Sequence, residues 1–299
     1  MFSTKFLSLS KPSKTKINKR LLSTLTPNLV TNKILLNKPK QKKDKLKAII
    51  FDMAGTLVDP FSITPSLMLV DLFKRYNITI NMKDTRHDMG LSKKDHLQKI
   101  LNMEHVKTQY KQINIDEMYQ SLENIIKQYG TKEYQKIITP EAPRLLNTLK
   151  QKNNLLFGAT SGYPYSLMTQ LAEHILPQYG VYLNMYASSE IYGKGRPYPY
   201  MIWENLSKLK IENPKCVLKV DDTVSGIQEG HNAGCWTCAV YGTSVYMDID
   251  SMTDYYSMNK NLIKSKEEKS KRKLLQESQP HFLIHNVGEL PQIVEYLNN

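Results

Sequence analysis

Carboxylates stand directly after two apolar runs of this 299-residue chain, where they could serve phosphoryl chemistry. Asp52 follows Phe51 and begins an Asp-x-x-Gly-Thr motif, while Asp221 and Asp222 follow the run 216–220. A carboxylate beside a tight turn can attack phosphorus, and Mg²⁺ usually takes one or two protein carboxylates plus water and phosphate oxygens. Adjacent aspartates repel each other, and a cation relieves that repulsion. We therefore predict a Mg²⁺ site here; a turn or N-cap aspartate is the alternative for Asp52.

A hydroxyl, a backbone N–H and a guanidinium could hold the phosphoryl group. Ser161 and Gly162 follow the run 155–160 and precede a predicted helix, a place that suits an anionic oxygen. Arg196 offers a permanently charged fork for the same anion, although such an arginine more often forms a surface ion pair. Each signal is weak alone. Together with the aspartates they indicate a phosphoryl-transfer site.

Apolar runs that alternate with helical patterns must position these residues. The predicted strands are 46–51, 155–160, 182–187, 216–220 and 281–285, and the predicted helices are 140–150, 165–175, 200–209, 224–233, 267–276 and 290–297. This alternation predicts an α/β fold with a doubly wound parallel sheet, in which ligands bind at the carboxyl ends of the strands. The polar residues that follow the strands should therefore meet in one crevice.

A long segment between the first two strands has a different pattern. From 64 to 138 apolar residues recur at helical spacing, and no strand-like run is clear. We predict a helical cap inserted into the core. The predicted organisation is a basic arm at 1–46, an α/β core formed by 47–62 and 139–299, and a helical cap at 63–138.

The order of these motifs resembles the haloacid dehalogenase superfamily and, within it, the phosphonatase family. The resemblance covers about residues 46–299 and leaves the arm outside. It is carried by Phe51–Asp59, Met89–His96, Ser161–Tyr163, Gly195–Met201, Asp222–Ser225, His281–Ile284 and Glu289–Pro291. It implies hydrolysis of the carbon–phosphorus bond of phosphonoacetaldehyde to acetaldehyde and phosphate, with Mg²⁺ as cofactor and a homodimer joined through the cap.

Ala54 and Lys93 decide which reaction the resemblance implies. Most phosphatases of the superfamily have a second aspartate at the Ala54 position, which protonates the departing oxygen. Carbon–phosphorus cleavage instead leaves a carbanion, and a lysine imine can take up its electrons as an enamine. Lys93 stands at the matching position for that imine, and Ser92-x-x-Asp95 reads as a capping box that places Lys93 in the first helical turn, where the helix dipole favours the neutral amine. His96 shares its helical face. A solvated lysine is the alternative.

The resemblance also implies a role for each site residue. Asp52 attacks phosphorus and forms an aspartyl phosphate, Lys93 forms the imine, and His96 handles protons. The implied Mg²⁺ ligands are Asp52, the Ala54 carbonyl and Asp222, and the implied substrate-binding residues are Ser161, Gly162, Arg196 and Met89.

Four positions depart from the family pattern. Met53 replaces a tryptophan, and Phe61 replaces a glycine near the site, where it could reshape the aldehyde pocket. Asp221 replaces a glycine and Gly226 an aspartate, so one carboxylate has moved along the chain while metal binding should survive. These differences bear on substrate range more than on reaction class.

Two other functions fit parts of the sequence. A related phosphatase or phosphomutase would act on a small phosphoester. A nucleic-acid-binding protein would use the arm on a catalytically idle core. Such a core would not need an intact set of reactive residues, and we therefore expect no nucleic-acid partner; the set here is Asp52, Lys93, Ser161, Arg196 and Asp222.

Almost all of the net positive charge lies at the beginning of the chain. Residues 1–47 carry thirteen basic side chains and one acid, which is +12 of the net +13. An acid-poor, amphipathic start is typical of a transit peptide, which predicts the mitochondrial matrix; a Lys/Asn-rich tail on a cytoplasmic enzyme is the alternative.

No apolar run is long enough to span a membrane. Three cysteines, Cys216, Cys235 and Cys238, are too few for a disulfide scaffold and are expected to pack in the interior.

Overall fold

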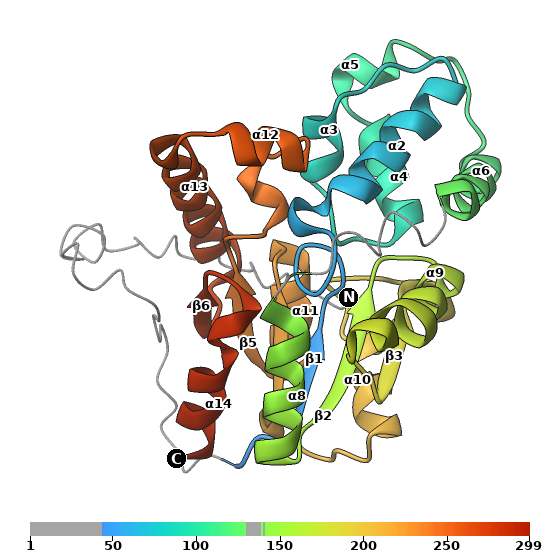
Figure 1. Ribbon diagram of the computed structural model, residues 1–299. Coiled ribbons are helices and arrows are strands. Elements are labelled where there is room, and N and C mark those ends of the chain that lie inside the picture. The colour runs from blue at the N-terminus through green and yellow to red at the C-terminus, as the bar shows by residue number, and fades with distance from the viewer. Residues whose placement is uncertain (1–43, 130–138, 140) are drawn as a thin grey trace, which may run out of the picture. The chain divides into compact units, whose positions relative to one another are not determined.

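The computed structural model describes residues 44–129, 139 and 141–299. Most of the predicted basic arm and the last part of the predicted cap lie outside the described residues. Six parallel strands form one sheet in the order β3-β2-β1-β4-β5-β6 (Figure 1). The strands are β1 (Ala48–Phe51), β2 (Leu156–Ser161), β3 (Met185–Ser188), β4 (Val217–Asp221), β5 (Trp236–Val240) and β6 (Phe282–Ile284).

Both faces of this sheet are covered by helices, as the alternating side chains of β1 show. Ile49 and Phe51 belong to an apolar cluster with α8 (Glu141–Asn153) and α14 (Leu290–Asn298). Ala48 and Ile50 point the other way, into a cluster that contains residues of α10 (Tyr200–Lys208) and α11 (Val224–Ala233). This arrangement confirms the predicted α/β class and the doubly wound sheet.

The central position of β1 brings the functional segments together. β1 pairs with β2 on one side and β4 on the other, and Phe51 is in register with both Ala159 and Val220. The chain adds β2 and β3 on one side of β1 and then β4, β5 and β6 on the other side. Because all strands are parallel, the segments that follow β1, β2 and β4 lie at the same edge of the sheet. Such a switch point is where open α/β sheets bind ligands.

Each predicted strand and helix of the core has a counterpart in the structure, but the structure also contains β5 and the short helix at Met252–Ser257, which were not predicted. β5 was not predicted, because it begins only three residues after the end of α11 and is only five residues long. The predicted helix 165–175 begins as α9 (Tyr165–Thr169) and continues as a π-helical turn, Gln170–Ile175. The predicted helix 267–276 is part of the longer α13 (Lys260–Ser278), which follows the short α12 (Met252–Ser257).

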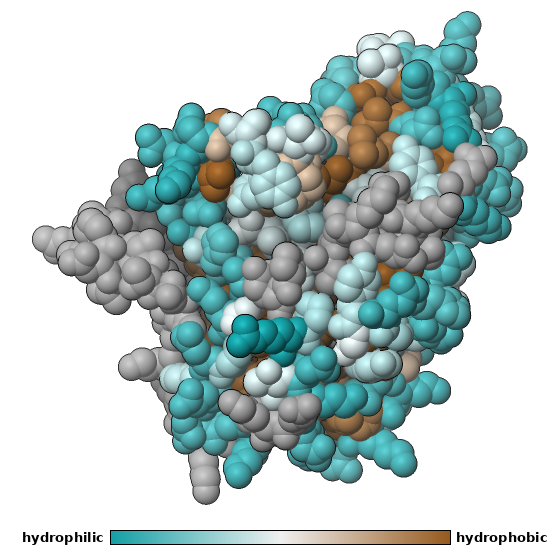
Figure 2. Space-filling view, in the orientation of Figure 1, coloured by the Kyte–Doolittle hydropathy of each residue, from teal (hydrophilic) through white to brown (hydrophobic). Residues whose placement is uncertain are grey.

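Five of the described α-helices lie between β1 and α8, and we call them the cap. They are α2 (Ile63–Arg75), α3 (Met82–Arg86), α4 (Lys93–Leu101), α5 (Glu104–Lys107) and α6 (Ile115–Tyr129). Apolar side chains gather on part of the visible face over these helices, whereas polar side chains cover most of the remainder (Figure 2). The helices among the described residues include none that is long and apolar enough to cross a membrane.

Local capping fixes where two functional helices begin. Ser92 is the N-cap of α4, and its side chain accepts from the Asp95 backbone N–H. Thr223 caps α11 by accepting from the Gly226 N–H, and α11 ends at Gly234, whose φ of 83° permits the left-handed turn. Lys93 is consequently the first residue of its helix, as the sequence predicted.

Candidate active site

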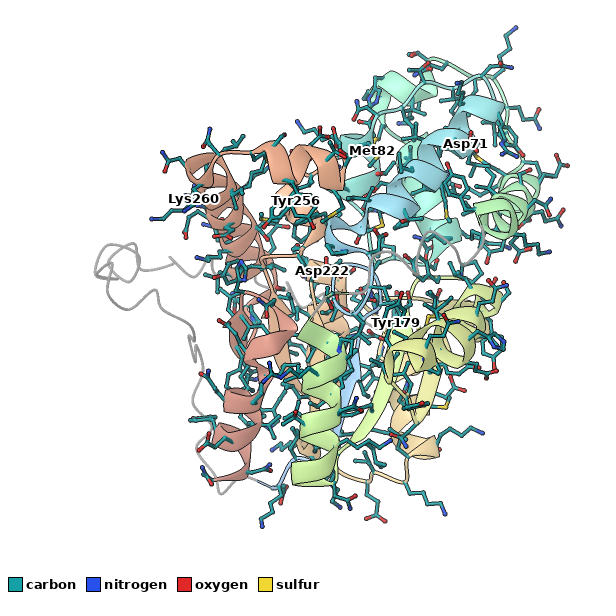
Figure 3. All side chains as sticks on the ribbon, in the orientation of Figure 1. Asp71, Met82, Tyr179, Asp222, Tyr256 and Lys260 are labelled. Carbon is teal, nitrogen blue, oxygen red and sulfur yellow. The ribbon has the colours of Figure 1, made fainter. Side chains whose placement is uncertain are left out.

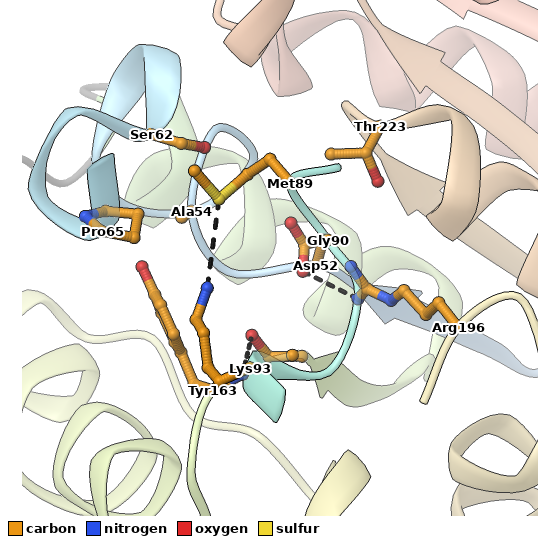
Figure 4. A pocket seen from close by; sticks show the side chains of 12 residues that line it. Asp52, Ala54, Ser62, Pro65, Met89, Gly90, Lys93, Tyr163, Arg196 and Thr223 are labelled. Carbon is orange, nitrogen blue, oxygen red and sulfur yellow. Dashed lines mark hydrogen bonds and ion pairs between the residues drawn. The ribbon is translucent and has the colours of Figure 1, made fainter. Parts of the chain in front are cut away.

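A small cavity lies where the cap meets the carboxyl ends of the strands (Figure 4). Its volume is about 20 Å³, which is enough for about one water molecule. Seven of the nine predicted site residues line it: Asp52, Ala54, Met89, Lys93, Ser161, Gly162 and Arg196. Asp222 lies buried between the sheet and the cap (Figure 3). The structure thus gathers residues from both the cap and the core around one cavity.

Three carboxylates near this cavity could hold a metal ion. Asp52, Asp221 and Asp222 each offer an oxygen, and these oxygens lie within 4.8 Å of one another. Burial raises the pKa of Asp222 well above its ordinary value, and the neighbouring Asp52 and Asp221 raise it further. A divalent cation would relieve that repulsion, so the donor set fits Mg²⁺.

The buried charges support the same conclusion. Four carboxylates and three basic side chains are buried in this region: Asp52, Asp221, Asp222, Glu229, Arg196, Lys219 and Lys93. When all four acids are ionised, one negative charge is in excess while Lys93 is protonated, and two are in excess once Lys93 is a neutral amine. Buried charges require partners, and one divalent cation would balance this group when Lys93 is neutral.

Gly226 explains how the shifted carboxylate is accommodated. A Cβ atom at residue 226 would lie 1.9 Å from Asp221 Oδ2, so the Asp221 carboxylate occupies the space that a side chain at 226 would need. Asp221 accepts from the Thr223 hydroxyl at 2.7 Å and pairs with Lys219 at 3.0 Å. The departures at 221 and 226 are thus linked, because the Asp221 carboxylate fits only where residue 226 has no side chain.

Arg196 is held far more tightly than a surface ion pair would be. Its Nη2 donates to Asp52 Oδ1 at 2.7 Å and to the Thr160 carbonyl at 2.6 Å, and its Nε donates to Glu229 at 3.0 Å. Nη1 is buried and has no hydrogen-bond partner among the residues that the structure describes. Because Arg196 lines the cavity, this remaining donor is available to an anionic ligand.

Lys219 and Glu229 are two members of this network that the sequence analysis missed. Lys219 Nζ donates to the Thr160 hydroxyl at 2.6 Å and lies 3.4 Å from Glu229, and both charged side chains are fully buried. A lysine inside the apolar run of β4 was the available signal, since an unpaired charge is rarely buried. The partner on α11 could not be identified without the tertiary structure.

Lys93 points its amine into the cavity (Figure 4). Its Nζ lies 4.0 Å from Met89 Sδ and 5.4 Å from the centre of the Tyr163 ring. Burial lowers the pKa of Lys93 to about 8, while Asp52 opposes this change and Arg196 adds to it. The amine is therefore easier to deprotonate, as predicted, but burial is the main cause where the sequence analysis named the helix dipole.

His96 lies on the same helix but not on the cavity wall. It is fully buried, and burial together with the charge on Lys93 lowers its pKa to about 3. The imidazole is consequently neutral at physiological pH. The predicted shared helical face is present, but direct contact of His96 with the cavity is not.

Phe61 lies next to a residue of the cavity wall, Ser62, but not on the wall itself. It packs in a separate apolar cluster with Met247 and Ile249, against the ring of Tyr255 at 5.0 Å. An effect of Phe61 on the aldehyde pocket would therefore be indirect, and it stays a prediction. Met53 is fully buried in the main core, and the three cysteines are free and buried, as expected for packing residues.

Comparison with known proteins places these features in a family. A model of the haloacid dehalogenase-like hydrolases matches residues 46–234. The chain is 30% identical over 262 residues to a phosphonoacetaldehyde hydrolase of Vibrio vulnificus (strain YJ016), a match that covers 84% of this chain and 94% of that one. It is 31% identical over 269 residues to a phosphonoacetaldehyde hydrolase of Psychromonas ingrahamii, covering 85% and 88% of the two chains. The crystal structure of a phosphonoacetaldehyde hydrolase-like protein from Oleispira antarctica has a similar fold, with a TM-score of 0.78 at 23% identity over 89% of this chain and 97% of that one.

Proposed function

The chain belongs to the haloacid dehalogenase-like hydrolase family and is an enzyme, and from this premise we propose that it hydrolyses the carbon–phosphorus bond of phosphonoacetaldehyde. The observation that carries the proposal is the buried Lys93 amine in the same cavity as Asp52 and Arg196. Relatives named phosphonoacetaldehyde hydrolase that match most of the chain support it.

Ala54 favours a carbon leaving group over an oxygen leaving group. An alkoxide that departs from phosphorus needs an acid to protonate it. Ala54 offers none at the cavity wall, and His96 does not reach that wall. A lysine imine removes the need, because it accepts the electron pair of the breaking bond.

The proposed reaction begins at Lys93. Its neutral amine adds to the aldehyde carbon, loss of water gives an imine, and protonation at nitrogen makes that imine an electron acceptor. An oxygen of Asp52 then forms a bond to phosphorus as the carbon–phosphorus bond breaks, and the electron pair moves into the imine to give an enamine. The enamine takes a proton on carbon, and water cleaves both the resulting imine and the aspartyl phosphate. Acetaldehyde, phosphate and free Lys93 are the products.

The other residues of the cavity orient the phosphonate. Arg196 Nη1, the Ser161 hydroxyl and the Gly162 N–H are the donors proposed to hold its oxygens. Asp52, Asp222 and the Ala54 carbonyl would hold Mg²⁺, with Asp221 beside them. When bound, Mg²⁺ supplies positive charge that offsets the charge of the phosphoryl oxygens and of the carboxylates.

Borohydride trapping tests the lysine and the substrate together. With phosphonoacetaldehyde present, reduction should leave a two-carbon adduct on the peptide that contains Lys93, and the untreated enzyme should release phosphate. Lys93→Ala should lose both signals. Lys99→Ala, an exposed lysine on the same helix, is the matched control and should keep them.

Unchanged phosphate release from Lys93→Ala would refute the mechanism. Hydrolysis of p-nitrophenyl phosphate faster than of phosphonoacetaldehyde would instead identify a phosphatase, and phosphate transfer within a sugar phosphate would identify a phosphomutase.

We further propose a homodimer and mitochondrial import. Sedimentation of the purified chain tests the dimer, and the location of a fluorescent protein fused after residue 46 tests import. A monomer, or a fusion that stays in the cytoplasm, would contradict the respective proposal.

A further inference from the structure

The side chain of Arg86, a buried arginine of the cap, donates hydrogen bonds to residues of the core. Arg86, the last residue of α3, is 5% exposed. Its Nη1 donates to Asp248 at 2.6 Å, and its Nη2 donates to the Ile249 carbonyl at 2.6 Å and to Asp250 at 2.5 Å. Three acceptors within three consecutive residues match the planar donor geometry of the guanidinium.

The segment that Arg86 contacts, residues 248–250, packs against the loop that follows Asp52. Ile249 packs in one apolar cluster with Met247 and Phe61, and Phe61 lies nine residues after Asp52. Lys266 of α13 donates to the Asp248 carbonyl at 2.8 Å, so the same segment is also bound to a core helix. A contact of Arg86 with this segment therefore connects the cap to the loop that carries Asp52.

Only six residues separate Arg86 from Lys93, and they are closely fitted against the core. A Cβ atom at Gly162 would lie 2.2 Å from the Leu91 carbonyl oxygen, so this loop leaves no space for a side chain there. The Ser225 hydroxyl donates to the Met89 carbonyl at 3.4 Å on the other side. If Arg86 moved away from the core, this short loop would move with it and would change the position of Lys93.

We propose that Arg86 is a positioning residue, which by binding Asp248, Ile249 and Asp250 holds the cap closed and keeps Lys93 over Asp52. The cavity of about 20 Å³ has room for about one water molecule, so we expect the contact to open and re-form when a substrate enters. Asp250 suits such a reversible contact because its side chain is 62% exposed and water can replace the arginine. A second contact, from Tyr119 of α6 to Glu190, remains when Arg86 is lost.

Chemical labelling of Lys93 tests the position of the cap without relying on the proposed function. The full chain is treated with trinitrobenzenesulfonate at pH 8, and mass spectrometry compares labelling of Lys93 with that of the exposed Lys99 on the same helix. Arg86→Met should raise this ratio at least about fivefold. The double variant Asp248→Asn, Asp250→Asn should also raise the labelling ratio, because it weakens the same contact by changing its core partners. Arg75→Met, which removes an exposed Arg75–Asp71 ion pair of the cap, should leave it unchanged.

Hydrogen exchange distinguishes positioning from a purely structural role. If Arg86 positions the cap, the amides of α2 and α4 stay protected in Arg86→Met while Lys93 becomes reactive. Equal loss of protection in α2 and α4, or an unchanged labelling ratio in both sets of variants, would overturn the proposal.

The consequence for catalysis rests on the proposed function. With phosphonoacetaldehyde, Arg86→Met should lower kcat/KM at least about fivefold, and Arg75→Met should not. A wild-type chain that labels as expected but does not turn over the phosphonate would contradict the proposed function and leave the positioning role standing.

Discussion

Replacement of Lys93 by methionine should abolish turnover and, at neutral pH, stabilise the fold. Lys93 is 6% exposed, and burial lowers its pKa from 10.5 to about 8. The folded protein thus binds this proton less tightly than the unfolded chain does. Methionine has a similar length and no charge, so it removes the cost of burying an ammonium group.

The magnitude and the pH range follow from that difference in pKa. A fall from 10.5 to about 8 corresponds to about 3 kcal/mol. Below about pH 8 the wild-type fold bears this whole cost. Between about pH 8 and 10.5 the unfolded chain holds more protons than the folded one, so wild-type stability rises with pH. The advantage of Lys93→Met should therefore shrink by about 2 kcal/mol between about pH 7 and 9.5.

Urea unfolding in metal-free buffer measures this effect. The free energy of unfolding is determined for the wild type, Lys93→Met and Lys99→Met at several pH values across that range, and Lys99 is exposed. The control should show the same difference from wild type at every pH. A pH-independent difference for Lys93→Met, or a lower stability at neutral pH, would refute the argument that Lys93 is buried at a cost.

Three further predictions concern the same site. The kcat/KM for phosphonoacetaldehyde should fall about tenfold per pH unit below about pH 8, because imine formation needs the neutral Lys93 amine; a flat pH profile would contradict this. Asp222→Asn should weaken Mg²⁺ binding at least about tenfold in calorimetry, since it removes one of three clustered carboxylates; unchanged affinity would exclude Asp222 as a ligand. Gly226→Asp should destabilise the fold by about 3 kcal/mol in urea unfolding, because its Cβ would overlap the Asp221 carboxylate. Asp221→Gly in the same chain should recover most of that loss, and no recovery would show that the two positions are independent.

Local sequence was sufficient for most of the fold. Apolar runs that end in polar residues predicted five of the six strands, and their alternation with helical patterns predicted the doubly wound sheet. β5 escaped detection because it is short and closely follows a helix. The strand-end position of Asp52, Ser161 and Asp222 then determined that they would meet, since the carboxyl ends of parallel strands share one edge.

The sequence by itself determined which chemical groups this protein possesses and, through strand order and helix caps, roughly where they lie. Only the tertiary structure decided the pKa values of these groups and the residues that contact them. Burial lowers the pKa of Lys93 and neutralises His96, and the space left by Gly226 admits Asp221. Contacts such as Arg86 with Asp248 join residues far apart in the chain. Desolvation and long-range pairing depend on the atoms packed around each group, and local sequence does not specify those atoms.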